Sequence, residues 1–207
     1  MKQSKVIGIT GGIATGKSTA IAHIRELGYP VIDSDLLARE VVEPGSEGLD
    51  AIQAFFGADI VVDGQLNRQM LGEIVFQNET MRLALNDIVH PLVYKAIKER
   101  IDTCVEGIVF VDSPLLFEGV GKAKSYGIHY DEVWLIDLDE DQQLARLIAR
   151  NGMTEFEAKN RMDAQWSMEK KRQLADVIID NRGSRQQLYH QVNEEIQRVE
   201  EVVRGEN

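Results

Sequence analysis

Nine consecutive residues near the start of the chain have the types and spacing of a loop that binds nucleotide phosphates. Two glycines with four residues between them are followed by a lysine and a hydroxyl residue. The glycines let the backbone curl so that its N–H groups point at phosphate oxygens. The lysine then reaches the outer phosphates, and Ser18 is the expected ligand of Mg²⁺. The residues expected to contact the nucleotide here are Gly11, Gly12, Ala14, Thr15, Gly16, Lys17, Ser18 and Thr19.

Two aspartates follow the second apolar segment of the chain. Residues 29–32 have the composition of a short strand, and Asp33 and Asp35 come directly after it. Ligands of open parallel sheets lie beyond the carboxyl ends of the strands, so both carboxylates are expected near the nucleotide. The alternative is that they only begin the next helix, expected over 35–43, which Ser34 could cap.

A third carboxylate, Asp112, ends the apolar segment 107–112. Such a strand resembles the one that carries a magnesium-side carboxylate in enzymes with phosphate-binding loops. The segment that follows, 113–119, is too apolar for a solvated loop. It either packs against the core as an ordinary loop or contributes to the site.

A basic cluster stands out in the last third of this acidic chain. Arg146 and Arg150 lie four residues apart and so share a helical face. For Arg150 and Arg161 we favour anion binding, because a guanidinium fork suits phosphate oxygens. For Lys170 and Lys171 we favour a solvated helical face. The glycine-punctuated segment between Asn151 and Arg172 suits a moving lid that keeps water from the reaction.

Alternating apolar segments and helical patterns must position these residues. Short strands are expected at 5–10, 29–32, 107–112, 132–137 and 174–181. The helices between them have recognisable starts and ends. Gly28 and Gly152 are helix ends, Thr154-Glu155-Phe156-Glu157 is a capping box, and Ser184 caps a last helix that reaches about Arg204. Strands that alternate with helices predict an α/β fold with a parallel sheet.

The segment from Ser46 to Val105 is almost entirely helical in pattern. It holds a tight turn at 60–66 and a helix over 68–76 that Asn67 can cap. Breaks are expected at Asn78 and at His90-Pro91, where the proline suits a first helical position. The segment is much longer than one crossover helix requires. It is best explained as an inserted helical lobe that holds a second substrate.

Composition limits the class of protein. The 207 residues carry a net charge of −11, which argues against a general nucleic-acid binder. A single cysteine, Cys104, excludes an internal disulfide and fits the reducing cytosol. No apolar segment approaches the roughly 18–20 residues of a membrane span, and no signal-peptide pattern begins the chain. We expect a cytoplasmic protein without membrane association or an obligate protein partner.

Three classes of protein use such a loop: switch GTPases, ATP-driven machines and small-molecule kinases. A GTPase would carry an Asn-Lys-x-Asp segment, and the nearest string, at 160–163, lacks the lysine. A machine usually needs a longer chain. A kinase needs a base near the acceptor hydroxyl, an acceptor lobe and a cationic lid. Asp33, the helical insertion and the arginines around 150–172 supply these parts.

The motifs together resemble those of dephospho-CoA kinases, in order and over nearly the whole chain. The matching segments are 10–18, 31–35 with Ala38-Arg39, Leu66-Asn67-Arg68, His90-Pro91, 114–118, Arg161-Met162 with Gln165, and 175–181. Departures are small. Ala14-Thr15 replaces the family's usual Gly-Ser, and Ser34 stands where alanine is frequent. Neither change removes a reactive group, although Ala14 has less backbone freedom than glycine.

The resemblance implies that ATP phosphorylates the ribose 3′-hydroxyl of dephospho-CoA, with Mg²⁺, to give CoA and ADP. Asp33 would be the catalytic base, and Lys17 with Arg150 would stabilise the transferred phosphoryl group. Asn181 would lie towards the adenine. The residues assigned to the acceptor substrate are Asp35, Arg68, His90, Leu115, Phe117, Glu118 and Arg161.

The implied architecture is a single P-loop kinase domain over 1–207, with a five-stranded parallel sheet flanked by helices. Its core comprises 1–35, 106–149 and 174–207, its helical CoA-binding lobe about 36–105, and its short helical lid about 150–173. Two alternatives remain open. One is another small-molecule kinase of the shikimate type, and the other is a nucleotide-binding regulatory protein that no longer turns over.

Overall fold

The structure is a computed structural model that describes residues 4–104 and 107–205. The outer ends of the expected core segments, at 1–3 and 206–207, and the expected boundary between lobe and core at 105–106 lie outside the described residues. The chain divides into two compact units, of which Asp33–Arg100 is one and the rest of the chain is the other.

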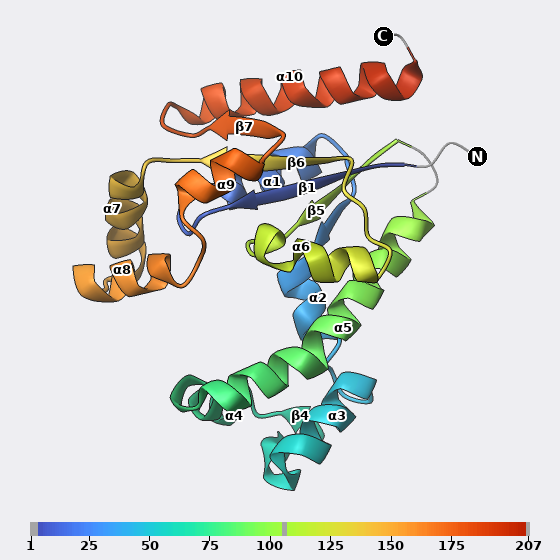
Figure 1. Cartoon of the computed structure of the whole chain (residues 1–207), viewed down its shortest axis with the longest axis vertical. Helices are drawn as coiled ribbons and strands as arrows, with labels where there is room; N and C mark the ends of the chain where they lie inside the picture. The colour runs from blue at the N-terminus through green and yellow to red at the C-terminus, as the bar shows by residue number, and fades with distance from the viewer. Residues whose placement is uncertain (1–3, 105–106, 206–207) are drawn as a thin grey trace. The chain divides into compact units, whose positions relative to one another are not determined.

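A five-stranded sheet forms the centre of the larger unit (Figure 1), with strand order β2-β5-β1-β6-β7. Its strands are β1 (Lys5–Gly11), β2 (Val31–Asp33), β5 (Ile108–Asp112), β6 (Glu132–Asp137) and β7 (Val177–Asp180). β1 pairs in parallel with β5 and β6, with Ile7 opposite Phe110 and Glu132. The five-stranded parallel sheet predicted from the apolar segments is confirmed.

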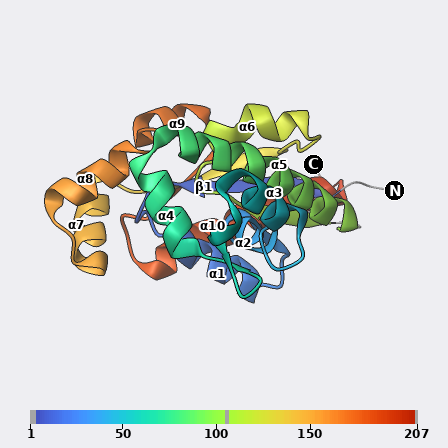
Figure 2. The same ribbon diagram turned by 90° about the horizontal axis from the view of Figure 1, so that it is seen from below.

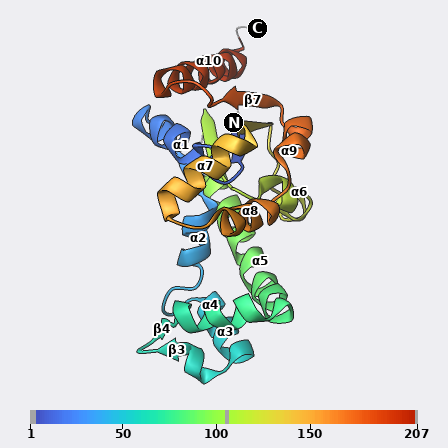
Figure 3. The ribbon, with the colours of Figure 1, turned by 90° about the vertical axis from the view of Figure 1, so that its left-hand side faces the viewer.

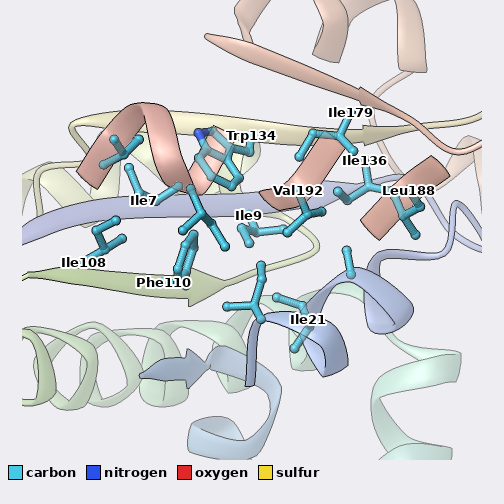
Figure 4. Close-up of a cluster of buried hydrophobic side chains, with 14 residues drawn as sticks. Ile7, Ile9, Ile21, Ile108, Phe110, Trp134, Ile136, Ile179, Leu188 and Val192 are labelled. Atoms are coloured by element: carbon cyan, nitrogen blue, oxygen red, sulfur yellow. The ribbon is translucent and has the colours of Figure 1, made fainter. Parts of the chain in front are cut away.

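Helices cover both faces of this sheet. The helices of the larger unit are α1 (Lys17–Glu26), α6 (Leu116–Ser125), α7 (Glu140–Asn151), α8 (Glu155–Asp163), α9 (Met168–Leu174) and α10 (Arg185–Arg204), and of these α1, α6, α9 and α10 contact the strands. α1 and α10 bury Ile21 and Val192 against Ile9, Phe110 and Trp134 of the strands (Figure 4). α7 and α8 pack side by side (Figure 2).

The opposite face of the sheet carries α6. There Leu116 and Phe117 of this helix pack with Val133 of β6, and Trp166 lies against the same cluster. Gly8 of β1 makes room for this packing, because a Cβ at this position would lie 2.5 Å from Leu116 Cδ1. Successive residues of β1 therefore face opposite sides of the sheet, with Ile7 and Ile9 towards α1 and α10 and Gly8 towards α6.

The smaller unit is built mainly from helices. Its elements after Asp33 are α2 (Ser34–Glu40), α3 (Glu47–Phe56), the 3₁₀ helix η1 (Ala58–Ile60), β3 (Val61–Val62), β4 (Gln65–Leu66), α4 (Arg68–Gln77) and α5 (Glu79–Thr103). β3 and β4 form the predicted tight hairpin (Figure 3), which turns through Asp63 and Gly64, both with positive φ. Ile52, Ile60 and Leu71 belong to the small hydrophobic core of this unit.

Three local predictions were wrong. The break at His90-Pro91 does not occur, because α5 runs through Pro91 without interruption. One proline removes only one helical hydrogen bond, and the buried Val93 and Ile97 follow it within the same helix. The segment 113–119 is not all loop, since α6 begins at Leu116 and buries Leu116 and Phe117.

The third error concerns the start of α2. Asp33, not Ser34, caps this helix: its Oδ1 accepts hydrogen bonds from the backbone N–H groups of Asp35 and Leu36, both at 3.0 Å. Both residue types are strong N-caps, so the sequence offered two adjacent candidates. The predicted capping box that begins α8 and the predicted Ser184 cap of α10 are confirmed, and Gln187 completes a capping box at the latter. Among the described residues, no helix is long and apolar enough to cross a membrane.

Candidate active site

The loop between β1 and α1 has the compact turn expected of a phosphate-binding loop. Thr15 donates from both its backbone N–H and its hydroxyl to the carbonyl oxygen of Gly12, at 3.3 and 2.9 Å. Gly16 then takes a left-handed conformation, with φ of 92°, and α1 begins at Lys17. The positive end of the α1 dipole and its unpaired N–H groups therefore open at this loop, as anion binding requires.

Close packing explains why two positions of the loop are glycine. A Cβ on Gly16 would lie 2.1 Å from Nδ2 of Asn181, and one on Gly12 would lie 2.5 Å from Oε1 of Gln143. Ala14 in contrast has a φ of 60°, a left-handed conformation that an alanine adopts only with strain. The departure from glycine at this position noted in the sequence therefore has a structural consequence.

Exchanging alanine and glycine within the loop should change stability in opposite directions. Ala14→Gly should raise the free energy of unfolding by about 1 kcal/mol, because glycine relieves the left-handed strain. Gly16→Ala should lower it by about 2 kcal/mol or more, since it adds both strain and overlap. Urea denaturation followed by circular dichroism measures both values. A loss of stability in Ala14→Gly would contradict this account of the loop.

Lys17 forms an ion pair with Asp112 inside the larger unit. Its Nζ donates to Oδ1 of Asp112, which is 7% exposed at the end of β5. Both groups are largely buried, so solvent screens their interaction only weakly. The strand-end carboxylate indicated by the sequence thus lies against the lysine of the loop.

Asn181, which follows the edge strand β7, contacts the same loop, and Arg146 of α7 contacts Asn181. The buried Asn181 donates from Nδ2 to the backbone carbonyl oxygen of Thr15 at 2.6 Å. The backbone carbonyl oxygen of Asn181 accepts from Nη2 of Arg146 at 3.3 Å. Arg150, one turn further along α7, donates instead to Oδ1 of Asn151 at 2.9 Å. The role predicted for Arg150 at the phosphates stays a prediction; Arg146, on the same helical face, is the arginine whose guanidinium lies beside Gly16 of the loop.

The segment between α8 and α9 also reaches the loop. Oε1 of Gln165 accepts a hydrogen bond from the backbone N–H of Ile13 at 3.0 Å. Beside this contact lies a pocket of about 180 Å³, which residues of the loop, of α7 and of the segment 162–168 enclose. Gln143, buried under the loop, is fixed by donating to the carbonyl oxygen of Leu138 at 2.8 Å.

Helix α9 is anchored by two adjacent basic residues. Arg172 holds the carboxylate of Asp137 at the end of β6, with Nε at 3.1 and 3.0 Å from its two oxygens. This contact is the main cause that raises the pKa of the Arg172 guanidinium. Lys171 is completely buried, so a solvated face is the wrong explanation for it. Lys170 is exposed and lies over the ring of Trp166, 3.1 Å from its centroid.

Of the remaining candidate residues in the larger unit, some are buried in the hydrophobic packing and others are exposed to solvent. Leu115 is 47% exposed and Phe117 is 5% exposed, within the cluster under β6. Glu118 accepts a hydrogen bond from the backbone N–H of Trp166 at 3.1 Å. Arg161 is exposed on α8. Their assignment to the acceptor substrate stays a prediction.

Four further candidates lie in the smaller unit. Asp33 ends β2 and caps α2, and Asp35 is exposed in the first turn of that helix. Arg68 begins α4 and donates from Nη2 to the carbonyl oxygen of Arg39 and to Oε1 of Glu43, at 3.3 and 3.1 Å. His90 lies within α5, and its ring contacts Tyr94 edge to face, with centroids 6.3 Å apart.

The parallel sheet and the phosphate-binding loop between β1 and α1 define a P-loop kinase fold. Comparisons with known proteins identify the particular family. The family model described as dephospho-CoA kinase matches residues 5–187. A curated dephospho-CoA kinase from Shouchella clausii is 45% identical over 191 residues, which cover 90% of this chain and 94% of that protein. The chain belongs to the dephospho-CoA kinase family.

Solved structures agree with this result. A crystal structure of TT1252 from Thermus thermophilus is 32% identical, with a TM-score of 0.78, and covers 95% of this chain and 98% of that one. A dephospho-CoA kinase from Campylobacter jejuni is 26% identical, with a TM-score of 0.66 and coverage of 96% and 98%. Both likenesses extend over almost the whole chain.

Proposed function

We propose that this protein transfers a phosphoryl group from ATP to the ribose 3′-hydroxyl of dephospho-CoA, giving CoA and ADP. The observation that carries this proposal is the match to the dephospho-CoA kinase family over residues 5–187, within which the phosphate-binding loop is intact. There are two alternatives. A kinase of another small molecule would form ADP with a different acceptor, and a regulatory protein without turnover would form none.

Phosphoryl transfer depends mainly on positioning and on stabilising charge. Gly11 to Thr19 would hold the phosphates of ATP with backbone N–H groups, and Asn181 would lie on the adenine side. Lys17 and Arg150 would offset the charge that spreads over the transferred group. Asp33 would orient the acceptor hydroxyl and accept its proton.

The residues around Lys17 are compatible with Mg²⁺. The ion prefers oxygen ligands and is usually bound through one or two protein groups together with substrate phosphates. Ser18 offers an exposed hydroxyl in the first turn of α1, and Asp112 offers a carboxylate at the end of β5. No group of three or more acidic, His or Cys side chains among the described residues forms a metal cluster. When bound, Mg²⁺ would neutralise phosphate charge.

The two-unit division supports a separate place for the acceptor. In this proposal the helical lobe, about 36–105, binds dephospho-CoA, and the lid, about 150–173, closes over the reaction in a cytoplasmic enzyme. Asp35, Arg68 and His90 would contact the acceptor from the lobe. The residues of the larger unit proposed for the acceptor are Leu115, Phe117, Glu118 and Arg161.

The test is ADP release from Mg-ATP measured by a coupled assay. We expect release with dephospho-CoA, and none above background with shikimate or without an acceptor. The phosphorylated product should be identified as CoA by mass spectrometry. An absence of dephospho-CoA-dependent ADP would refute the proposal, and shikimate-dependent ADP would favour the other kinase.

Arg150→Lys should lower turnover by about 10-fold or more while the protein stays folded, because lysine lacks the planar fork that binds a phosphoryl group bidentately. Arg146→Lys provides the comparison, since its guanidinium lies beside the loop. Arg185→Lys, an exposed change on α10, is the matched control and should leave turnover unchanged. A fall in Arg146→Lys alone would move the proposed role from Arg150 to Arg146.

A further inference from the structure

A buried lysine is the most unusual charged residue of the larger unit. Lys171, in α9, is 0% exposed, yet lysine carries a strongly hydrated ammonium group. Its Nζ donates to the carbonyl oxygen of Pro114 at 3.3 Å and lies 3.5 Å from Oε1 of Glu118. A buried lysine is stable only when such partners offset its desolvation, so these contacts define its surroundings.

Electrostatics around this lysine act in opposite directions. Burial lowers the pKa of the Lys171 ammonium, and the positive charge of Lys17 lowers it further. The charge of Glu118 and its hydrogen bond raise the pKa. Each of these two effects is smaller than that of burial and larger than that of Lys17. The connection between Lys171 and the phosphate-binding loop rests on the contacts of its two partners, Glu118 and Pro114.

Glu118 connects this lysine to the segment that contacts the loop. Its Oε1 accepts from the backbone N–H of Trp166 at 3.1 Å, in addition to facing Lys171. The neighbour of Trp166 is Gln165, whose Oε1 accepts from the N–H of Ile13. A continuous path of contacts therefore leads from the interior of α9 through α6 to the backbone of the loop.

A second path runs through the turn that follows β5. The carbonyl oxygen of Pro114 accepts from Lys171 and also from the hydroxyl of Thr10, at 3.3 Å. Thr10 directly precedes the first loop glycine, and Pro114 lies two residues after Asp112, the partner of Lys17. Both paths begin at Lys171 of α9, and the first also uses α6; Figure 3 shows these two helices on the same side of the sheet.

We propose that Lys171 is a positioning residue for phosphoryl transfer, which holds the turn after β5 and the segment before α9 against the phosphate-binding loop. The inference rests on the proposed function, because the reaction it serves is that phosphoryl transfer. Lys171 acts through Glu118 and Pro114 and does not touch the reacting atoms. Loss of this lysine should displace the loop slightly, and small displacements lower turnover strongly.

The test is a double-mutant cycle on Lys171 and Glu118. Lys171→Met keeps the length of the side chain and removes its charge, and Glu118→Gln removes the opposite charge. We expect Lys171→Met to lower kcat by about 10- to 100-fold while the KM for ATP changes by less than about 3-fold. Because both side chains belong to one path, the double variant should have a kcat close to that of Lys171→Met alone.

Melting temperatures separate positioning from a purely structural role. Lys171→Met leaves the carboxylate of Glu118 in a largely buried place without its cation, so its Tm should fall by about 6 °C or more. The double variant should regain most of this Tm without regaining kcat. A kcat that recovers together with Tm, an additive effect of the two changes, or an unchanged kcat in Lys171→Met would each overturn the proposal.

Two controls complete the design. Wild-type ADP release with dephospho-CoA is measured in parallel: if it is absent, the proposed function fails and this inference fails with it. If the wild type is active and the variants match it, only the inference fails. Lys171→Arg serves if Lys171→Met does not fold, because it keeps the charge and changes the geometry. A lower kcat at the wild-type Tm supports positioning, and a wild-type kcat overturns it.

Discussion

Asp33→Asn should reduce turnover by about 100-fold or more and leave both the fold and the KM for ATP nearly unchanged. The structure indicates that this substitution should change the chemistry of residue 33 without removing the helix cap. Oδ1 of Asp33 caps α2 through two backbone N–H groups, and asparagine caps helices as well as aspartate does. The variant therefore keeps the structural role of the side chain and removes its capacity to accept a proton.

The matched control is Asp50→Asn, which makes the same change in the first turn of α3. It should leave turnover unchanged and alter the free energy of unfolding by less than about 1 kcal/mol. Asp33→Ala is a useful third variant, because it loses the cap as well and should cost about 1 kcal/mol of stability. Turnover of Asp33→Asn within a few-fold of wild type would show that Asp33 only begins the helix.

The order of elements was predictable because its signals are local. Short apolar segments predicted the strands, and the capping box at Thr154 and the cap at Ser184 predicted the starts of α8 and α10. The loop was recognisable for the same reason, since its glycines, lysine and serine are contiguous. Local signals failed where two of them competed, as at Asp33 and Ser34, or where one was overridden, as at Pro91 within α5.

The surroundings of the loop were harder to predict, since they depend on residues distant in the sequence. Gln165 and Ile13 lie 152 residues apart, and Asn181 and Thr15 lie 166 apart. Lys171 has the same type as its neighbour Lys170, yet one is completely buried and the other is exposed. Only the meeting of α6 with α9 distinguishes them. Sequence patterns identify such a residue as basic but contain no information on its partner.

Lys17→Met should reduce turnover by about 100- to 1,000-fold, because it removes a preorganised positive charge from the phosphates. The same change at Lys5 is the matched control. Lys5 lies at the start of β1, half-exposed, and pairs with Asp131 at 2.8 Å, so its loss should change stability by less than about 1 kcal/mol and leave turnover unchanged. Steady-state ADP release and urea denaturation of both variants provide the comparison.

The ion pair with Asp112 complicates a simple interpretation of Lys17→Met, because the variant also removes a cation from a carboxylate that is 7% exposed. Stability should therefore fall together with turnover. Adding Asp112→Asn separates the two effects, since it removes the buried charge and should restore stability. Turnover should stay low, because no cation returns to the phosphates. If turnover recovered with stability, Lys17 would be a structural partner of Asp112 and its proposed role in phosphoryl transfer would be wrong.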